Sequence, residues 1–348
     1  MRELDLREPR SHEVLVRVEA VGVCGTDLHV VKGEWDRPKP MVLGHEGAGT
    51  VEAVGEDVDS LQPGDQVVLS WAPSCGACAD CRRGRPAACI ELQRAIGNGT
   101  LLDGTTGLEL DGETIYRGTA TGALTELLTV DAAVALPLGE GVPLEQAALL
   151  GCAALTGVGA VLFQARPEPG SIVLVVGAGG VGQFCVQGAR IAGAAEIVCV
   201  DPLEARLEQA SRLGATRTAT PEGLPETLRQ VAPDGADVAL DAVGSPETAA
   251  FALRWTRNGG RAVLVGLPAA GERLDFDPAE FVRREKELTG SMYGSEDPRR
   301  SLPALLEHVR SGALELAPLV GPTFPLDDVN AAIEASLAGS PGRVLVLP

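Results

Sequence analysis

The chain has 348 residues, of which 48 are acidic and 29 basic, giving a formal net charge of −19. This length suggests two domains, and so acidic a chain does not favour nucleic acid, whose phosphates are bound by Lys and Arg. No run approaches the roughly 18–20 apolar residues of a membrane span, and the charged amino terminus differs from signal and transit peptides. We therefore expect a cytoplasmic protein that binds neither nucleic acid nor membrane.

The first part of the chain reads as β structure. Residues 14–70 alternate between apolar and polar side chains and are broken by Gly, Pro and Asp, which predicts an antiparallel, barrel-like β domain. Residues 75–120 contain four cysteines and then a Gly- and Thr-rich stretch, which predicts a long loop or loose hairpin. From about residue 144 the run LEQAALLGCAALTGVGAVLFQA has helical spacing and predicts an apolar helix before a second domain.

The second part alternates between strand-like and helical runs. The strand-like runs are SIVLVV, EIVCVD, ATRTAT, ADVALD, RAVLVG and ELTGS, and helical stretches between them predict a doubly wound parallel sheet. The tail then has two helical runs and a final strand, RVLVLP. We predict an α/β protein with a β-rich domain from residues 1–153 and 294–348 and a dinucleotide-binding domain from residues 154–293.

A glycine-rich turn stands at the start of the second domain. The segment 177–182, Gly-Ala-Gly-Gly-Val-Gly, follows the strand SIVLVV and opens a helix, which is the context of a dinucleotide-binding turn. Such a turn lets the pyrophosphate approach a helix N-terminus. The residues expected to hold the cofactor here are Gly177, Gly179, Gly180, Val181 and Gly182.

The choice of dinucleotide depends on Asp201, which ends the next strand about twenty residues further on. A carboxylate there accepts hydrogen bonds from the adenosine ribose and would repel a 2′-phosphate. Pro202 and Leu203, which follow it, offer no cation. The sequence therefore favours NAD over NADP; an ordinary βα turn is the alternative interpretation.

Eight cysteines in a long chain without a secretory signal indicate metal binding more than disulfides. Cys75, Cys78, Cys81 and Cys89 lie within fifteen residues. Four thiolates at this spacing can surround one zinc ion and leave no open position, so the lobe 75–89 predicts a structural zinc site. An iron–sulfur cluster or adventitious cysteines are the alternatives.

A second group comes from distant parts of the sequence. Cys24 and His45 lie beside strands, and Cys152 lies in the predicted apolar helix. Each alone could be a core thiol or a turn histidine. Together they would give three ligands and an open fourth position, which is typical of a catalytic zinc. The remaining cysteines, Cys185 and Cys199, have apolar neighbours and are predicted to be core thiols.

The chain resembles the zinc-containing medium-chain alcohol dehydrogenases. The resemblance rests on Cys-Gly-Thr-Asp-x-His at 24–29, Gly-His-Glu at 44–46, the four-cysteine lobe and the glycine turn, which occur in the family order and span nearly the whole chain. It implies a GroES-like catalytic domain, a Rossmann domain, two Zn²⁺ per subunit and NAD. It also implies a homodimer, or a homotetramer, acting on a small alcohol or aldehyde.

The resemblance also implies roles for individual residues. Cys24, His45 and Cys152 match the catalytic zinc ligands, Glu46 the carboxylate behind the metal, and Asp27 the carboxylate that orients the ligand histidine. The remaining matches are Thr26 and His29 in a proton relay, Thr156 at the nicotinamide and Arg343 at the cofactor pyrophosphate.

The substrate implied is a primary alcohol, aromatic or of medium chain length. Cys152 stands where polyol dehydrogenases commonly have glutamate, and Trp35 and Trp71 are expected either to line the substrate cleft or to pack in the core. A polyol dehydrogenase and an S-(hydroxymethyl)glutathione (formaldehyde) dehydrogenase are the alternatives. The second is kept because the stretch 93–120 resembles a longer form found in dimeric relatives. Arg94 favours it, but no clear carboxylate and arginine set lies near Trp35 and Gln93. A zinc-free quinone-reductase-like or nucleotide-binding protein would belong to a different class and usually lacks these ligands.

Overall fold

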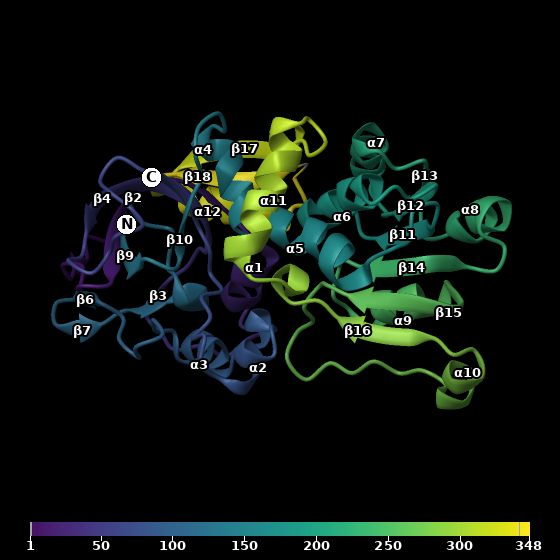
Figure 1. Ribbon diagram of the computed structural model, residues 1–348, viewed down its shortest axis with the longest axis horizontal. Coiled ribbons are helices and arrows are strands. Elements are labelled where there is room, and N and C mark those ends of the chain that lie inside the picture. Colours follow the sequence, from purple (N-terminus) through teal and green to yellow (C-terminus); the bar gives the residue numbers. More distant parts are fainter. Residues whose placement is uncertain (1, 341) are drawn as a thin grey trace. The chain divides into compact units, whose positions relative to one another are not determined.

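The computed structural model describes residues 2–340 and 342–348, and the chain divides into two compact units (Figure 1). Unit 1 comprises residues 1–152, 297–303 and 316–348, and unit 2 comprises residues 153–296 and 304–315. Each unit has its own sheet. The β-rich unit and the doubly wound unit together give the two-domain α/β fold that the sequence predicts.

Unit 1 is built on a seven-stranded sheet of order β10-β5-β4-β2-β18-β17, in which β9 also pairs with β2. Its strands are β2 (Glu13–Gly22), β4 (Glu46–Val54), β5 (Gln66–Leu69), β9 (Leu127–Asp131), β10 (Ala135–Pro137), β17 (Val320–Pro325) and β18 (Arg343–Leu347). All pairings are antiparallel except the parallel pair β17 and β18. The strands of residues 14–70, which are β2, β4 and β5, pair antiparallel as predicted. The sequence analysis did not predict β17.

The alternation along β2 explains how this sheet forms its core. Val14, Val16 and Val18 are 0%, 0% and 2% exposed, because successive side chains of a strand point to opposite faces. They pack with Leu69 and Leu128 in one apolar cluster. The long β2 has β4 along one side and β9 and then β18 along the other, so it connects the amino-terminal region with the carboxy-terminal tail.

Shorter elements complete unit 1. The Gly- and Thr-rich stretch expected to be a loop or loose hairpin contains the antiparallel pair β6 (Leu108–Leu110) and β7 (Glu113–Thr114). The helix α3 (Ile90–Asn98), which the sequence analysis missed, precedes it. This helix buries Leu92 and Ala95 and ends at Gly99 in the left-handed region, φ 65°. The other elements are β1 (Asp5–Leu6), β3 (Met41–Val42), β6 (Leu108–Leu110), β7 (Glu113–Thr114), β8 (Tyr116–Arg117), α1 (Gly25–Val31), α2 (Ala79–Arg82), α3 (Ile90–Asn98), α4 (Leu144–Ala147) and α12 (Val329–Leu337).

The apolar run from residue 144 is not one helix. It forms α4, a 3-10 turn at Ala148–Gly151, α5 (Ala153–Gly159) and a π-helical turn at Ala160–Ala165. Cys152 lies at the break, with φ −146° and ψ −70°, so the prediction that it lies within a helix was wrong. Helical spacing cannot reveal such a break, because every residue from Ala147 to Val161 is buried.

Unit 2 contains the parallel sheet that the six strand-like runs predict. Its order is β13-β12-β11-β14-β15-β16, and all five pairings are parallel. The strands are β11 (Ile172–Val176), β12 (Glu196–Val200), β13 (Arg217–Ala219), β14 (Ala236–Asp241), β15 (Thr256–Leu264) and β16 (Glu287–Gly290). Its helices are α6 (Gly180–Ile191), α7 (Glu204–Leu213), α8 (Leu224–Val231), α9 (Pro246–Arg254) and α10 (Pro278–Arg283), and α11 (Pro298–Arg310) spans residues of both units.

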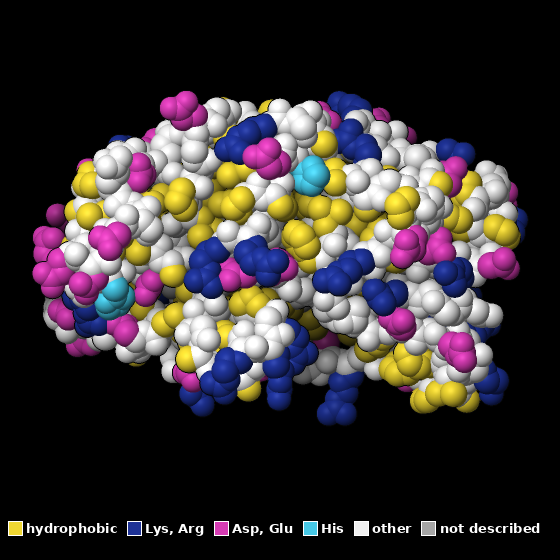
Figure 2. Space-filling view, in the orientation of Figure 1, with side chains coloured by type: hydrophobic (Ala, Val, Ile, Leu, Met, Phe, Trp, Pro, Cys, Tyr) yellow, Lys and Arg dark blue, Asp and Glu magenta, His cyan; other side chains and the backbone are white. Residues whose placement is uncertain are grey.

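Within the described residues, no single helix has the length and apolar character to cross a membrane; the bent pair Leu144–Gly151 and Ala153–Ala165 meets the test only when taken together. On the face in Figure 2, basic side chains gather over the region of α2 and α3, although the whole chain is acidic.

Candidate functional site

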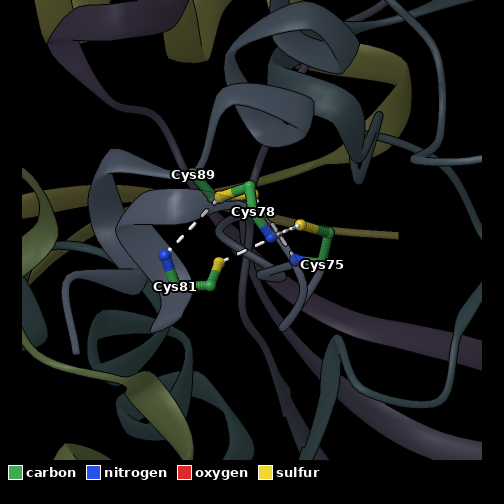
Figure 3. A group of neighbouring side chains, drawn as sticks. All are labelled: Cys75, Cys78, Cys81 and Cys89. Carbon is green, nitrogen blue, oxygen red and sulfur yellow. Dashed lines mark hydrogen bonds between the residues drawn. The ribbon is translucent and has the colours of Figure 1, made fainter. Parts of the chain in front are cut away.

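Four cysteine side chains of unit 1 converge on one point (Figure 3). Cys75 precedes α2, Cys78 caps its N-terminus, Cys81 lies within it and Cys89 follows the 3-10 turn Pro86–Ala88. All four sulfur atoms lie within 4.8 Å of one another, and Cys75 Sγ is 4.0 Å from Cys81 Sγ. Zinc–sulfur bonds of about 2.3 Å place tetrahedral sulfurs roughly 3.8 Å apart, so this group fits a zinc ion.

Backbone N–H groups point at the sulfur atoms of this lobe. Cys78 N donates to Cys75 Sγ at 3.3 Å, and Cys75 N donates to Cys89 Sγ at 3.4 Å. Bonds from the backbone of Cys81 and Ile90 lower the pKa of Cys78 to about 6, whereas burial and the neighbouring thiols raise the pKa of Cys81 to about 12. A cation would therefore have to replace protons on some of these thiols as it binds.

Cys24, His45 and Cys152 form the second group, with their ligand atoms also within 4.8 Å of one another. Cys24 ends the connection from β2 to α1, His45 immediately precedes β4, and Cys152 lies at the helix break. Their exposed fractions are 8%, 1% and 6%. Three segments far apart in the sequence thus place two sulfurs and one imidazole at a buried point, which suits three zinc ligands with a fourth position for a substrate.

Asp27 connects two of these ligands and fixes the ring of one. Its carboxylate accepts hydrogen bonds from Cys24 N and Gly44 N, each at 3.1 Å, and lies 3.3 Å from His45 Nδ1. A buried carboxylate beside Nδ1 holds the proton on that nitrogen and leaves Nε2 free for a metal. Burial opposes the charged form of His45, but the negative charges of Asp27 and Cys24 raise its pKa well above the ordinary value.

The pKa values of the two thiols, Cys24 and Cys152, are shifted in opposite directions. A hydrogen bond from Cys152 lowers the pKa of Cys24 well below its usual value, with the positive charges of Arg343 and His45 adding to the effect. The same bond, together with burial, raises the pKa of Cys152. Cys24 is therefore the more readily ionised of the two thiols, and Cys152 would lose its proton when a metal binds.

Glu46, the first residue of β4, forms a buried ion pair with Arg343, the first residue of β18. Arg343 Nε donates to Glu46 Oε1 at 2.9 Å and Nη1 donates to Val23 O at 3.2 Å. Burial raises the pKa of Glu46 to about 7 against the opposing charge of Arg343. Glu46 Oε2 and Arg343 Nη2 have no hydrogen-bond partner among the described residues, so each has an atom left for a ligand.

The other predicted residues have the following places in the fold. Thr26 is half-buried in the first turn of α1 and His29 lies in its last turn. The ring of Trp71 meets that of His45 edge-on, with centroids 6.2 Å apart. Trp35 instead stacks on His29. Thr156, which is 9% exposed, lies in α5 of unit 2.

The glycine turn of unit 2 connects β11 to α6, whose N-cap is Gly179. A Cβ on Gly182 would lie 1.8 Å from Gly177 O, whereas one on Gly179 would meet no atom within 4 Å. Position 182 therefore needs glycine so that the turn can form. Gly179 leaves open space at a helix N-terminus, where a phosphate would bind. Gly180 and Val181 begin α6 in the same turn.

Asp201 is 3% exposed and follows β12 directly. Its carboxylate accepts hydrogen bonds from Ala178 N of the glycine turn at 2.8 Å and from Leu203 N at 2.9 Å. Arg206 Nη1 lies 3.7 Å away. Sequence reasoning considered only the two residues after Asp201 and missed this cation, although its place in the first turn of a predicted helix was a usable signal.

The second-unit cysteines lie in the core. Cys185 on α6 and Cys199 on β12 are both 0% exposed, and burial raises the pKa of Cys185 to about 12. They are not among the described groups that could hold a metal.

Comparison with known proteins identifies the family. Residues 10–140 match the alcohol dehydrogenase GroES-like domain, and residues 180–311 match the zinc-binding dehydrogenase domain. S-(hydroxymethyl)glutathione dehydrogenase from Synechocystis sp. is 34% identical, over 99% of this chain and 95% of that protein. The structure of benzyl alcohol dehydrogenase from Acinetobacter calcoaceticus has a TM-score of 0.93 at 32% identity, over 99% of this chain and 94% of that one.

A further solved structure, an alcohol dehydrogenase zinc-binding domain protein from Burkholderia ambifaria, has a TM-score of 0.92 at 34% identity and covers 99% of this chain and 94% of its own. These similarities extend over nearly the entire length of each protein. The chain belongs to the zinc-containing medium-chain alcohol dehydrogenases, and it is an oxidoreductase of that family.

Proposed function

We propose that this enzyme binds two zinc ions per subunit and oxidises a primary alcohol, aromatic or of medium chain length, with NAD. The observation that carries the proposal is the convergence of Cys24, His45 and Cys152 at a buried point lined by Trp71. Zinc held there supplies a Lewis acid that makes the alcohol proton easier to remove, and NAD supplies the hydride acceptor.

The chain's own residues position the reactants and carry the proton. Asp27 orients His45, while Glu46 accepts a hydrogen bond from Arg343 behind the ligand group. Thr26 and His29 would form the proton relay: the Thr26 hydroxyl would accept the proton of the alcohol, and His29 would exchange it with solvent. Thr156 would contact the nicotinamide, and Arg343, whose Nη2 has no hydrogen-bond partner among the described residues, would bind the pyrophosphate.

Thr26→Ala tests the relay. The variant should retain both zinc ions but lose turnover by about 100-fold, because a positioned proton-transfer group contributes at least that much. Elemental analysis measures the zinc content of the variant, and steady-state kinetics measure its turnover. Undiminished turnover would remove Thr26 from the relay.

NAD is proposed as the cofactor because the buried Asp201 stands at the end of β12, next to the glycine turn. Arg206 weakens the repulsion that this carboxylate exerts on a 2′-phosphate, since the two side chains are 3.7 Å apart. Binding constants for NAD and NADP, measured with wild type and Asp201→Asn, test this choice. Wild type should prefer NAD and the variant should lose that preference; tighter NADP binding by wild type would contradict the proposal.

S-(hydroxymethyl)glutathione is the second candidate. The Synechocystis relative acts on it by name, and the lobe around α2 carries exposed arginines that could face its carboxylates (Figure 2). These are Arg82, Arg83, Arg85 and Arg94. Against this candidate, Arg94 is already paired with Glu91 at 2.8 Å and Arg85 with Asp80 at 2.8 Å.

A zinc count and a substrate panel test the function. Two zinc ions per subunit support the proposal, one leaves only the four-cysteine site, and none contradicts both sites. Cys152→Ser should lower zinc content toward one and abolish turnover, while Cys185→Ser is the matched control, since its thiol is buried in unit 2. Benzylic and medium-chain alcohols should exceed polyols and S-(hydroxymethyl)glutathione in kcat/KM; the reverse order would favour the second candidate.

The proposed assembly is a homodimer, with a homotetramer as the alternative, and the proposed location is the cytoplasm. β16 pairs only with β15 among the described strands and so has a free edge for a second copy. The eight cysteines are free, as expected in a reducing compartment. Light scattering of the purified protein measures the assembly.

A further inference from the structure

His29, the last protein group of the proposed relay, has two side-chain partners in the turn after α1. Its Nδ1 is hydrogen-bonded to Glu34 Oε2. Its ring stacks on that of Trp35, with centroids 4.6 Å apart and planes at 12°. The two contacts act on different parts of the imidazole, because one holds a nitrogen at the ring edge and the other covers a ring face.

The backbone of this turn explains why both partners are in place. Gly33 has φ 73°, and its N–H donates to Val30 O at 3.1 Å, while Glu34 N donates to His29 O at 2.9 Å. This pair of bonds around a left-handed glycine is the Schellman arrangement that ends many helices. It returns the chain toward His29, so the residues next to the glycine lie beside the histidine.

The Glu34 carboxylate decides which ring nitrogen carries the proton. An ionised carboxylate only accepts hydrogen bonds, so Nδ1 must be the donor and Nε2 keeps its lone pair. Glu34 Oε1 lies 3.8 Å from Lys32 Nζ. The Arg37 guanidinium lies 5.6 Å from the Trp35 ring centroid. A free imidazole prefers the opposite tautomer, with its proton on Nε2.

We propose that Glu34 is a positioning residue that holds His29 as the Nδ1–H tautomer, so that Nε2 is the base that takes the proton in turnover. This inference rests on the proposed relay. In turnover, Nε2 would accept the proton that the relay carries from the alcohol, which gives an imidazolium, and would then release it to water. The His29 side chain is 22% exposed. The bond from Nδ1–H to Glu34 persists throughout, and Glu34 gains and loses no proton.

Kinetics of the zinc- and NAD-loaded enzyme give the first test. Glu34→Gln should lower kcat by about 10-fold, the lower end of what loss of an orienting partner costs, with KM for the alcohol unchanged. Glu34→Asp should recover part of the loss. Asp36→Asn is the matched control, because it removes an exposed carboxylate two residues away, and it should leave kcat unchanged.

A double-variant cycle separates this inference from the relay itself. In a His29→Asn background, Glu34→Gln should have no further effect, because its action passes through the ring. If kcat falls in His29→Asn but not in Glu34→Gln, the inference is overturned and the relay remains intact. A rise in KM alone in Glu34→Gln also overturns it, because that would make Glu34 a substrate contact. Unchanged turnover in His29→Asn overturns the relay, and the inferred catalytic role with it.

The second readout needs neither cofactor nor turnover. Nitrogen-15 NMR of the cofactor-free protein at about pH 9, where free imidazole is neutral, reports the tautomer of each of the four histidines. The His29→Asn spectrum assigns the signal. Wild type and Asp36→Asn should show His29 protonated on Nδ1, and Glu34→Gln should shift it toward Nε2. The Nε2–H form in wild type overturns the inference whatever the activity.

Discussion

Gly22 illustrates how a single residue supports the buried ion pair behind the proposed zinc ligands. It is the last residue of β2, and a Cβ there would lie 2.4 Å from Glu46 Oε1 and 2.9 Å from Glu46 Cγ. Glu46 is 0% exposed and Oε1 accepts the bond from Arg343. The carboxylate therefore occupies the space of the missing side chain and has little freedom to move away.

Gly22→Ala should lower the free energy of unfolding by about 1–3 kcal/mol, the usual effect of inserting a methyl group into a packed interior. It should also weaken zinc retention, because Glu46 and Arg343 must shift. Urea denaturation and metal analysis measure the two effects. Gly97→Ala is the control, since a Cβ there meets nothing within 4 Å; equal stability of the two variants would show that the Glu46 contact is not restrictive.

At this scale the sequence predicts chemistry better than it predicts contacts. The four cysteines of the lobe could be grouped from spacing, because they lie within one short segment. Grouping Cys24, His45 and Cys152 depended on family resemblance, since only the fold brings such distant residues together. The partners of His29 were missed for a different reason: the turn that places Glu34 and Trp35 depends on the left-handed Gly33, and a lone glycine signals a helix end without saying which side chains meet.

Among the elements, the amino-terminal segment is held to the main sheet through one carboxylate on β2. Glu13 is 1% exposed and accepts hydrogen bonds from Arg7 at 2.7 and 2.8 Å and from Arg10 N at 2.8 Å. Burial alone would raise the pKa of Glu13, but the bonds from Arg7 and Arg10 outweigh it, and the net pKa lies below the ordinary value. The native state therefore binds this proton less readily than the unfolded chain.

The sign of the pH effect follows. The contribution of Glu13 to stability is fully present above the unfolded pKa of about 4.3 and is lost as pH falls through the lower folded value. Glu13→Gln should lower the free energy of unfolding near neutral pH by about 1.5–3 kcal/mol, the range for charged hydrogen bonds, and this difference should shrink below about pH 4. Urea titrations across that range measure it.

Glu8→Gln is the control for this prediction, because Glu8 is an exposed carboxylate in the same segment. It should change stability little at any pH. A difference between Glu13→Gln and wild type that stays constant down to acid pH would contradict the pKa argument, although it would leave the hydrogen bonds themselves in place.

Elements with a strong periodic pattern were predicted well, and those without one were not. The parallel strands of unit 2 are short apolar runs between helices, and all six form as expected. The missed strand β17 reads VGPTFP, with two prolines and a glycine that argue against a strand. It forms at a sheet edge beside β18, where missing N–H donors are tolerated. The break at Cys152 was hidden because its surroundings are apolar on every side.

Over the whole molecule, the proposed metal sites and the proposed cofactor turn lie in different units. All seven candidate zinc ligands belong to unit 1, whereas the glycine turn and Asp201 belong to unit 2. Each unit also has its own apolar core, one around β2 and β4 and the other around β11 and β14. Metal binding should therefore stabilise unit 1 more than unit 2, because a ligand stabilises the structure that contains its site.

Removing zinc with a chelator should therefore produce a local response. Hydrogen exchange followed by mass spectrometry should show lost protection in residues 75–98, where the lobe consists only of short helices and turns around the cysteines. A smaller loss should appear around Cys24 and His45, because β2 and β4 remain in a paired sheet. Peptides from β11 and β14 should keep their protection.

Cys81→Ser provides the matched comparison for chelation, because it removes one ligand of the lobe and none of the buried trio. It should reproduce the loss of protection at 75–98 without the loss around Cys24. If chelation instead unprotected β11 and β14 as strongly as the lobe, the two units would unfold as one cooperative body, and the independence inferred from their separate cores would be wrong.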